Sequence, residues 1–213
     1  MSSDVLVTTP AQRQTEPHAE AVSRNRRQQA TFRKVLAAAM ATLREKSYAD
    51  LTVRLVAARA KVAPATADTY FSSKNHLIAE VYLDLVRQVP CVTDVNVPMP
   101  IRVTSSLRHL ALVVADEPEI GAACTAALLD GGADPAVRAV RDRIGAEIHR
   151  RITSAIGPGA DPGTVFALEM AFFGALVQAG SGTFTYHEIA DRLGYVVGLI
   201  LAGANEPSTG GSE

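Results

Sequence analysis

TVRLVAARAKVAPATADTYFSSKNHL, residues Thr52 to Leu77, is the stretch that decides the fold. Thr52 is suited to cap a short helix, because its side-chain oxygen can accept a hydrogen bond from a backbone N–H of the first turn. The chain then turns at Lys61-Val62-Ala63, and Pro64 is well placed at the first position of a second short helix, where its missing N–H costs nothing. A short capped helix, a tight turn and a second short helix predict a helix-turn-helix.

The segments on either side of this stretch predict two longer helices. Before it, apolar residues recur at steps of three and four and therefore share one helical face: Phe32, Val35, Leu36, Ala39, Met40 and Leu43. After it, Ser72 or Ser73 is expected to cap a helix from Lys74 to about Val89. The two short helices therefore lie between two amphipathic helices that can hold them.

Charge is unevenly distributed along the chain, although the net charge is only -1. Between Arg24 and Pro90 there are twelve Lys and Arg against five Asp and Glu, and the remainder has nine against seventeen. A cationic block joined to an acidic block indicates a polyanion partner for the first part only, with chance segregation of solvated charge as the alternative.

Prolines and glycines divide the rest of the chain into further helices, and no stretch alternates like a strand for long. We expect helices at about 101–115, 118–130, 134–156, 162–182 and 185–203. The predicted fold class is therefore all-α, with about nine helices. It consists of a disordered tail (1–23), a helix-turn-helix domain (24–89), a second helical domain (90–204) and another disordered tail (205–213).

The run from Thr69 to Leu77 resembles the end of the DNA-binding domain of the TetR/AcrR family, in which a Tyr-Phe-x-x-Lys motif opens the fourth helix. The resemblance covers roughly residues 28–77. It implies a three-helix DNA-binding domain followed by a helical domain that binds an effector and forms the dimer. The implied function is a ligand-responsive transcriptional regulator, most often a repressor that a small molecule releases from a palindromic operator on double-stranded DNA.

The resemblance implies that Arg54, Thr66, Thr69, Tyr70 and Lys74 contact DNA. Pro64 and Ala65 are further candidates because small side chains let the start of the helix approach base edges, and Asp68 is a candidate as a hydrogen-bond acceptor. Arg54 is expected to reach a guanine and Thr69 a base edge or a thymine methyl, while Thr66, Tyr70 and Lys74 hold phosphates. The alternatives are a packed core aromatic for Tyr70 and a free surface lysine for Lys74. The basic run Arg24–Arg27 is expected either to lie along the DNA backbone or in a minor groove, or to be a solvated tail.

Three residues depart from the family pattern. Lys61 stands where the family usually has Gly, which costs about 1 kcal/mol if the turn needs a positive φ. Ala63 stands where Ser often caps the third helix, which forfeits about 0.5–2 kcal/mol. Asp68 replaces a common aromatic residue; it either accepts from cytosine N4 or points to solvent or pairs with Lys61 or a nearby Arg.

The last two predicted helices indicate a homodimer. Helix 162–182 is apolar nearly all round, and helix 185–203 combines small residues four apart with aliphatic ones, so each is expected to be buried on more than one side. The alternative is a monomer core with two internal helices. The three helices before them have few polar groups, so a cavity among them would suit a small hydrophobic effector. Candidate ligand-binding residues are His109, Cys124, Met170 and Phe173, the alternatives being a half-exposed His109 and core roles for Met170 and Phe173.

Other classes of protein are disfavoured by the sequence. Two cysteines without a CxxC motif indicate reduced thiols in a cytoplasmic protein, and we expect no metal site and no cofactor. No uninterrupted apolar run has the length of a membrane span, no secretion signal is visible, and no catalytic motif appears. We therefore expect no enzyme; the remaining rivals are a helical interaction module without a DNA role and a TetR-like activator.

Overall fold

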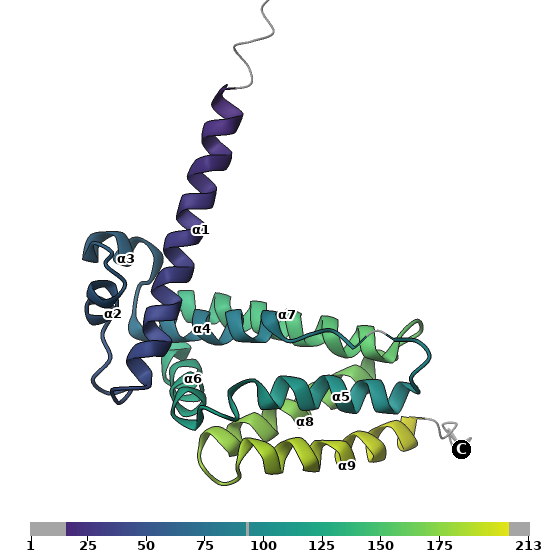
Figure 1. The fold of residues 1–213 in the computed structure, drawn as a ribbon. Helices are drawn as coiled ribbons and strands as arrows, with labels where there is room; N and C mark the ends of the chain where they lie inside the picture. Colours follow the sequence, from purple (N-terminus) through teal and green to yellow (C-terminus); the bar gives the residue numbers. More distant parts are fainter. Residues whose placement is uncertain (1–15, 93, 205–213) are drawn as a thin grey trace, which may run out of the picture.

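The computed structural model describes residues 16–92 and 94–204, and within them the chain is entirely helical (Figure 1). The α-helices are α1 (Glu16–Leu43), α2 (Val53–Arg59), α3 (Pro64–Tyr70), α4 (Lys74–Gln88), α5 (Met99–Ala111), α6 (Pro118–Asp130), α7 (Pro135–Ile156), α8 (Pro162–Gly180) and α9 (Tyr186–Ala204). Two short 3-10 turns follow α5 and α6, at Leu112–Val114 and Gly131–Ala133. The all-α prediction is confirmed, and helix boundaries fall within a few residues of those expected from the sequence, except at the start of α1.

Side-chain caps fix where the helices begin. The Thr52 side chain accepts a hydrogen bond from the N–H of Leu55 at 3.1 Å, and the Ser73 side chain accepts one from the N–H of His76 at 3.0 Å. At α9, Thr185 and Glu188 form a reciprocal capping box, with the N–H of each bonded to the side chain of the other. Each cap satisfies a backbone donor that the first helical turn would otherwise leave unpaired.

The first helix begins earlier than the sequence prediction. Residues 16–23 were expected to lie in a disordered tail, but they belong to α1, which projects from the rest of the molecule (Figure 1). The physical reason is that this segment contains several strong helix formers, and extending an existing helix adds one hydrogen bond for each residue fixed. Residues 1–15 and 205–213, the remainder of the predicted tails, lie outside the described residues.

A single hydrophobic core runs through the molecule, and α4 connects its two parts. α4 packs against α1 on one side and against α6 and α7 on the other, so it belongs both to the helix-turn-helix and to the larger bundle. In that bundle α5 and α8 each pack against α9, and α6 packs against α8 (Figure 1). A displacement of α4 relative to α6 or α7 therefore changes the support of α2 and α3.

α8 is long and apolar enough to cross a membrane by length and composition alone. In this fold it packs against α6, α7 and α9, so it is a helix of the bundle. Its outward face nevertheless stays open to solvent.

Candidate nucleic-acid interface and cavity

The outer surface of α3 is exposed in the part of the chain that the structure describes. Ala67 on its inner face is fully buried, which anchors the helix. The residues that the sequence assigned to DNA contact on this helix are exposed: Pro64, Ala65, Thr66, Asp68 and Thr69. Because these side chains are small apart from Asp68, the N-terminal end of α3 can approach a groove closely.

Aromatic rings hold α3 against α1. The ring of Phe71 is buried and stacks on Phe32 with 5.2 Å between centroids, while Tyr70 meets Phe32 edge-on at 5.9 Å. Tyr70 is only half-buried, so its packing and a phosphate contact are both compatible with this geometry. Phe71 thus packs between α3 and α1.

The two polar side chains in the middle of α3 differ in what they offer. The Thr69 hydroxyl donates to the carbonyl oxygen of Thr66 at 2.6 Å, so its methyl group is left for contact with a base. Asp68 is exposed and forms no ion pair with any described residue. Asp68 is therefore not paired with Lys61 or a nearby Arg. Two of its predicted roles remain: exposure to solvent, or accepting a hydrogen bond from cytosine N4.

The two departures in the turn before α3 have the predicted consequences. Lys61 adopts φ +53°, the left-handed region that favours glycine. Ala63 is the N-cap of α3 and provides no side-chain hydrogen bond. The turn thus stores backbone strain and lacks a cap, at a cost of about 1 kcal/mol for each.

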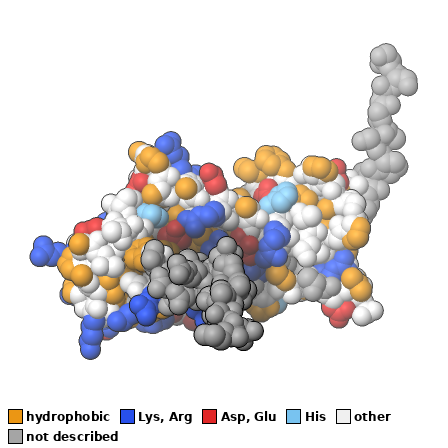
Figure 2. Space-filling view, turned by 90° about the horizontal axis from the view of Figure 1, so that it is seen from above, with side chains coloured by type: hydrophobic (Ala, Val, Ile, Leu, Met, Phe, Trp, Pro, Cys, Tyr) orange, Lys and Arg blue, Asp and Glu red, His pale blue; other side chains and the backbone are white. Residues whose placement is uncertain are grey.

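Cations near α3 fall into paired and unpaired groups. Arg44 forms a bidentate ion pair with Glu117, and Arg59 forms one with Glu45, whose carboxyl pKa it holds below the ordinary value through the hydrogen bonds. In contrast, Arg54 and Lys61 are exposed and form no ion pair with any residue in the described part of the chain. Unpaired cations thus flank α3, and Lys and Arg side chains project at this end of the molecule (Figure 2).

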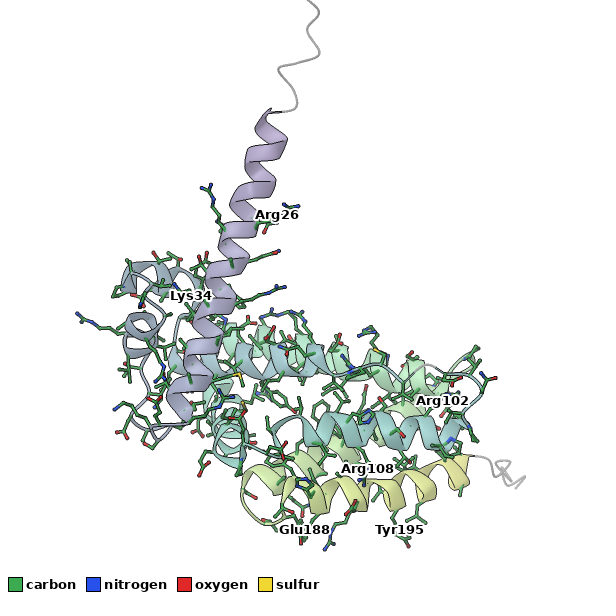
Figure 3. The ribbon with its side chains drawn as sticks, viewed as in Figure 1. Arg26, Lys34, Arg102, Arg108, Glu188 and Tyr195 are labelled. Carbon is green, nitrogen blue, oxygen red and sulfur yellow. The ribbon has the colours of Figure 1, made fainter. Side chains whose placement is uncertain are left out.

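The basic segment of α1 extends this surface. Arg26 and Lys34 project from α1, Lys34 at the level of α3 and Arg26 further out (Figure 3). Because this segment belongs to α1, the basic run is held on a helix and is not a flexible tail, which was one of its alternatives. A helix of this kind suits contact along a DNA backbone better than insertion into a minor groove.

Lys74 has a structural contact that the sequence did not reveal. Its ammonium group donates to the carbonyl oxygens of Tyr48 at 3.2 Å and Ala49 at 3.5 Å, and it lies over the Tyr48 ring. It is therefore not a free surface lysine.

A chain of polar contacts joins the start of α4 to α7. Asp134 caps α7 by accepting from the N–H of Ala136 at 2.9 Å, and it also accepts from the Ser73 hydroxyl at 2.9 Å. About two turns further along α4, the Glu80 carboxylate pairs with Arg143 of α7 and lies 3.6 Å from His76. These contacts connect α7 to α4, the helix that follows α3.

A cavity of about 700 Å³ lies among α4, α6, α7 and α8. Its walls are mostly apolar, with contributions from Leu128, Leu129, Ile144, Phe173, Leu176 and Val177. Charged residues also line it, namely Arg141, Asp142, His149 and Glu169, and the His149 Nδ1 lies 2.8 Å from the Glu169 carboxylate. The size and lining are those of a site for a small, largely apolar molecule.

The cavity contains two of the four predicted ligand-binding residues. Cys124 and Phe173 line it, and burial raises the pKa of the Cys124 thiol to about 12. His109 is exposed on α5 and Met170 is 56% exposed on α8, and neither is part of this wall. The sequence prediction missed Tyr82, His149 and Tyr186. Of these, Tyr82 carried a recognisable signal, since its phenol lies on the otherwise aliphatic buried face of α4.

An apolar strip on α8 and α9 is exposed in the single chain. We call it the α8–α9 face; it contains Phe166, Met170, Val177, Tyr195 and Leu199. Tyr195 is 72% exposed and points away from the bundle (Figure 3). Between these residues, Gly174 and Gly198 have no heavy atom within 4 Å of the position of an added Cβ, so nothing in this chain requires a glycine there.

Comparison with known proteins finds a sequence match in the N-terminal part and a similar fold over most of the chain. Residues 35–81 match the model for bacterial regulatory proteins of the tetR family. A TetR transcriptional regulator from Rhodococcus sp. RHA1 is similar in structure, with a TM-score of 0.69 and 21% identity, over 84% of this chain and 98% of that one. FadR from Thermus thermophilus, a TetR-family repressor solved with lauroyl-CoA, has a TM-score of 0.61 and 17% identity, over 85% and 99%. FadR from Bacillus subtilis, solved with stearoyl-CoA, has a TM-score of 0.54 and 13% identity, over 81% and 98%.

Proposed function

We propose that the chain is a TetR-family transcriptional regulator, because residues 35–81 match the family model and the fold is similar over most of the chain. We infer that it is a homodimeric, cytoplasmic repressor that binds a palindromic operator and leaves it when a small hydrophobic effector binds. In this proposal residues 24–89 bind DNA and residues 90–204 bind the effector and form the dimer. The family and fold are those of transcription regulators and not of enzymes.

The proposal that the protein binds DNA rests on the exposed N-terminal end of α3. It presents small side chains to a groove, while Arg54 supplies an unpaired guanidinium from α2. An Arg can donate two hydrogen bonds to guanine O6 and N7, which is the commonest specific contact in the major groove. An interaction module without a DNA role gives no reason for unpaired cations on both sides of this helix.

The α8–α9 face supports the dimer. Its exposed aromatic and aliphatic side chains lie on two adjacent helices, and the open glycines permit close approach of a second copy. Two copies of this face would form an isologous four-helix interface. The interface would fix the separation of the two α3 helices, which must be about 34 Å to match successive major grooves.

The cavity supports effector control. Its apolar walls suit an acyl chain, and two proteins of the same fold were solved with acyl-CoA ligands. α4 lines the cavity through Tyr82 and supports α3 through its first turn, so a ligand that prefers another position of α4 changes DNA affinity. It can do so only by the difference in its affinity for the two states.

Fluorescence anisotropy tests the DNA function directly. The purified protein is titrated onto the DNA upstream of its own gene at two salt concentrations, with Arg54→Ala and Arg87→Ala alongside. Arg87 is a matched control because it is exposed at the far end of α4 and its loss changes the net charge equally. We expect tight, salt-dependent binding that Arg54→Ala weakens about tenfold or more and Arg87→Ala leaves unchanged.

Three other outcomes would count against parts of the proposal. Equal losses in both variants would mean that net charge alone attracts DNA and that Arg54 reads no base. If neither this DNA nor a genome-wide footprint yields a bound site, the repressor function is wrong. A bound site whose gene is expressed less after deletion of the regulator would make the protein an activator.

A further inference from the structure

The wall of the cavity contains a buried phenol without a hydrogen-bond partner. Tyr82 is 5% exposed, and its hydroxyl is sealed from solvent without a bond to any described residue. Buried hydroxyls are normally paired, because an unpaired polar group loses its interaction with water and gains nothing in return. An unpaired hydroxyl in a cavity wall indicates that a partner is supplied by whatever occupies the cavity.

The titratable groups that act on this phenol, Cys124 and Tyr186, are uncharged. Burial is the main cause that raises the pKa of Tyr82 and of its neighbours Cys124 and Tyr186, so all three remain protonated at neutral pH. The charged lining residues lie elsewhere: Arg141 and Asp142 are exposed, and His149 is exposed beside Glu169. The cavity thus has a neutral buried end and a charged open end.

We propose that the effector is an amphiphile with an uncharged oxygen, a hydroxyl or a carbonyl, at its inner end, where Tyr82 donates a hydrogen bond to it. The inference rests on the proposed function, because it assigns the chemistry of the effector. The hydrocarbon body of the ligand lies against Leu128, Ile144 and Leu176. An anionic group is disfavoured at the inner end, where no cation would compensate its desolvation; it belongs at the open end near Arg141.

A plain acyl chain fits the same walls but leaves the phenol unpaired. The plain acyl chain and the chain with an inner oxygen therefore differ by one atom, and the Tyr82 side chain distinguishes them. Replacing Tyr82 with Phe keeps the ring and removes only that oxygen. Because the oxygen has no protein partner, the variant should fold as the wild type does.

Isothermal titration calorimetry of the full chain with dodecanoic acid and 12-hydroxydodecanoic acid tests this assignment. We expect the wild type to bind the hydroxylated acid about tenfold more tightly, and Tyr82→Phe to lose that preference. Thr153→Val is the matched control, because it removes the other buried unpaired hydroxyl, which does not line this cavity. It should keep the wild-type preference.

Equal affinities in the wild type, binding of neither acid, or a preference that survives in Tyr82→Phe would each overturn the assignment. Operator binding, measured without ligand, separates this failure from that of the repressor proposal. If the operator is bound and the preference is absent, only the effector chemistry is wrong. If neither is observed, the proposed function fails as well.

Discussion

The ammonium group of Lys74 lies 3.2 Å from the carbonyl oxygen of Tyr48 and 4.5 Å from the centroid of the Tyr48 ring. The lysine at the start of α4 thus binds the segment between α1 and α2, and this segment has no regular secondary structure of its own. A charged donor held in this way stiffens the scaffold of the helix-turn-helix, and the N–H that remains can face a phosphate.

Lys74→Met tests both roles. We expect the free energy of unfolding in urea to fall by about 1–3 kcal/mol, since a charge-assisted hydrogen bond and a cation–π contact are lost. We also expect the slope of log K against log salt for operator binding to decrease by about 0.9. A loss of stability with an unchanged slope would remove Lys74 from the phosphate contacts and leave its structural role.

The ion pair between Glu80 and Arg143 makes stability depend on pH. Burial alone would raise the pKa of Glu80, but hydrogen bonds from His76 and Arg143 and their charges hold it below the ordinary value of 4.5. The stability that the Glu80 carboxylate contributes is therefore fully present when the pH is above the pKa that Glu80 has in the unfolded chain. It is lost as the pH falls through the lower pKa of the folded state.

We expect Glu80→Gln to destabilise the protein by about 1.5–3 kcal/mol at pH 7, measured by urea unfolding, and to destabilise it less at pH 3. The exposed carboxylate of Glu119 offers a control, and Glu119→Gln should follow the wild type at both pH values. A difference between Glu80→Gln and wild type that stays constant from pH 7 to pH 3 would show that the charge of Glu80 contributes nothing.

Local signals predicted most of the fold but not the contents of the cavity. Thr52, Pro64 and the three-four spacing in α1 each act within one or two turns, so the sequence predicts them directly. The positive φ of Lys61 was also expected, because it stands in a turn where a glycine is usual. The early start of α1 was missed because a polar, aperiodic segment carries no hydrophobic periodicity that would indicate a helix.

The cavity depends on how α6, α7 and α8 pack, which spacing within one helix does not determine. His109 and His149 are both single histidines on amphipathic helices, yet only His149 reaches the cavity wall. The rotation of each helix about its axis decides this, and long-range packing sets that rotation. The Lys74 contact with Tyr48 likewise joins residues 26 positions apart, beyond the reach of any local pattern.

Gly145 offers a way to close the cavity without disturbing the fold. It lies in the middle of α7, lines the cavity, and an added Cβ would meet no atom within 4 Å. We expect Gly145→Leu to fill the cavity and lower the affinity for lauroyl-CoA or another acyl probe at least about tenfold in calorimetry. Stability should rise by about 0.5–1 kcal/mol, because a helical glycine is removed.

Gly145→Ala is the control for that substitution, since it brings the same gain in helix propensity and adds a single methyl group. Operator affinity should be unchanged in both variants, and only Gly145→Leu should fail to leave the operator when the probe is added. Normal release of Gly145→Leu by the probe would place the effector elsewhere.

The α8–α9 face makes a prediction about assembly. Leu199 and Leu129 are both 56% exposed, but only Leu199 lies on this face. Leu199→Arg would place two arginines in an apolar two-fold interface, where each unpaired buried charge costs several kcal/mol, whereas Leu129→Arg introduces the same charge outside it. By sedimentation equilibrium we expect a dimer for the wild type and for Leu129→Arg, and a monomer for Leu199→Arg.

The monomer should also lose affinity for a palindromic operator while keeping the helical circular dichroism of the wild type, because only the spacing of the two α3 helices is lost. A dimeric Leu199→Arg would show that another surface joins the two subunits.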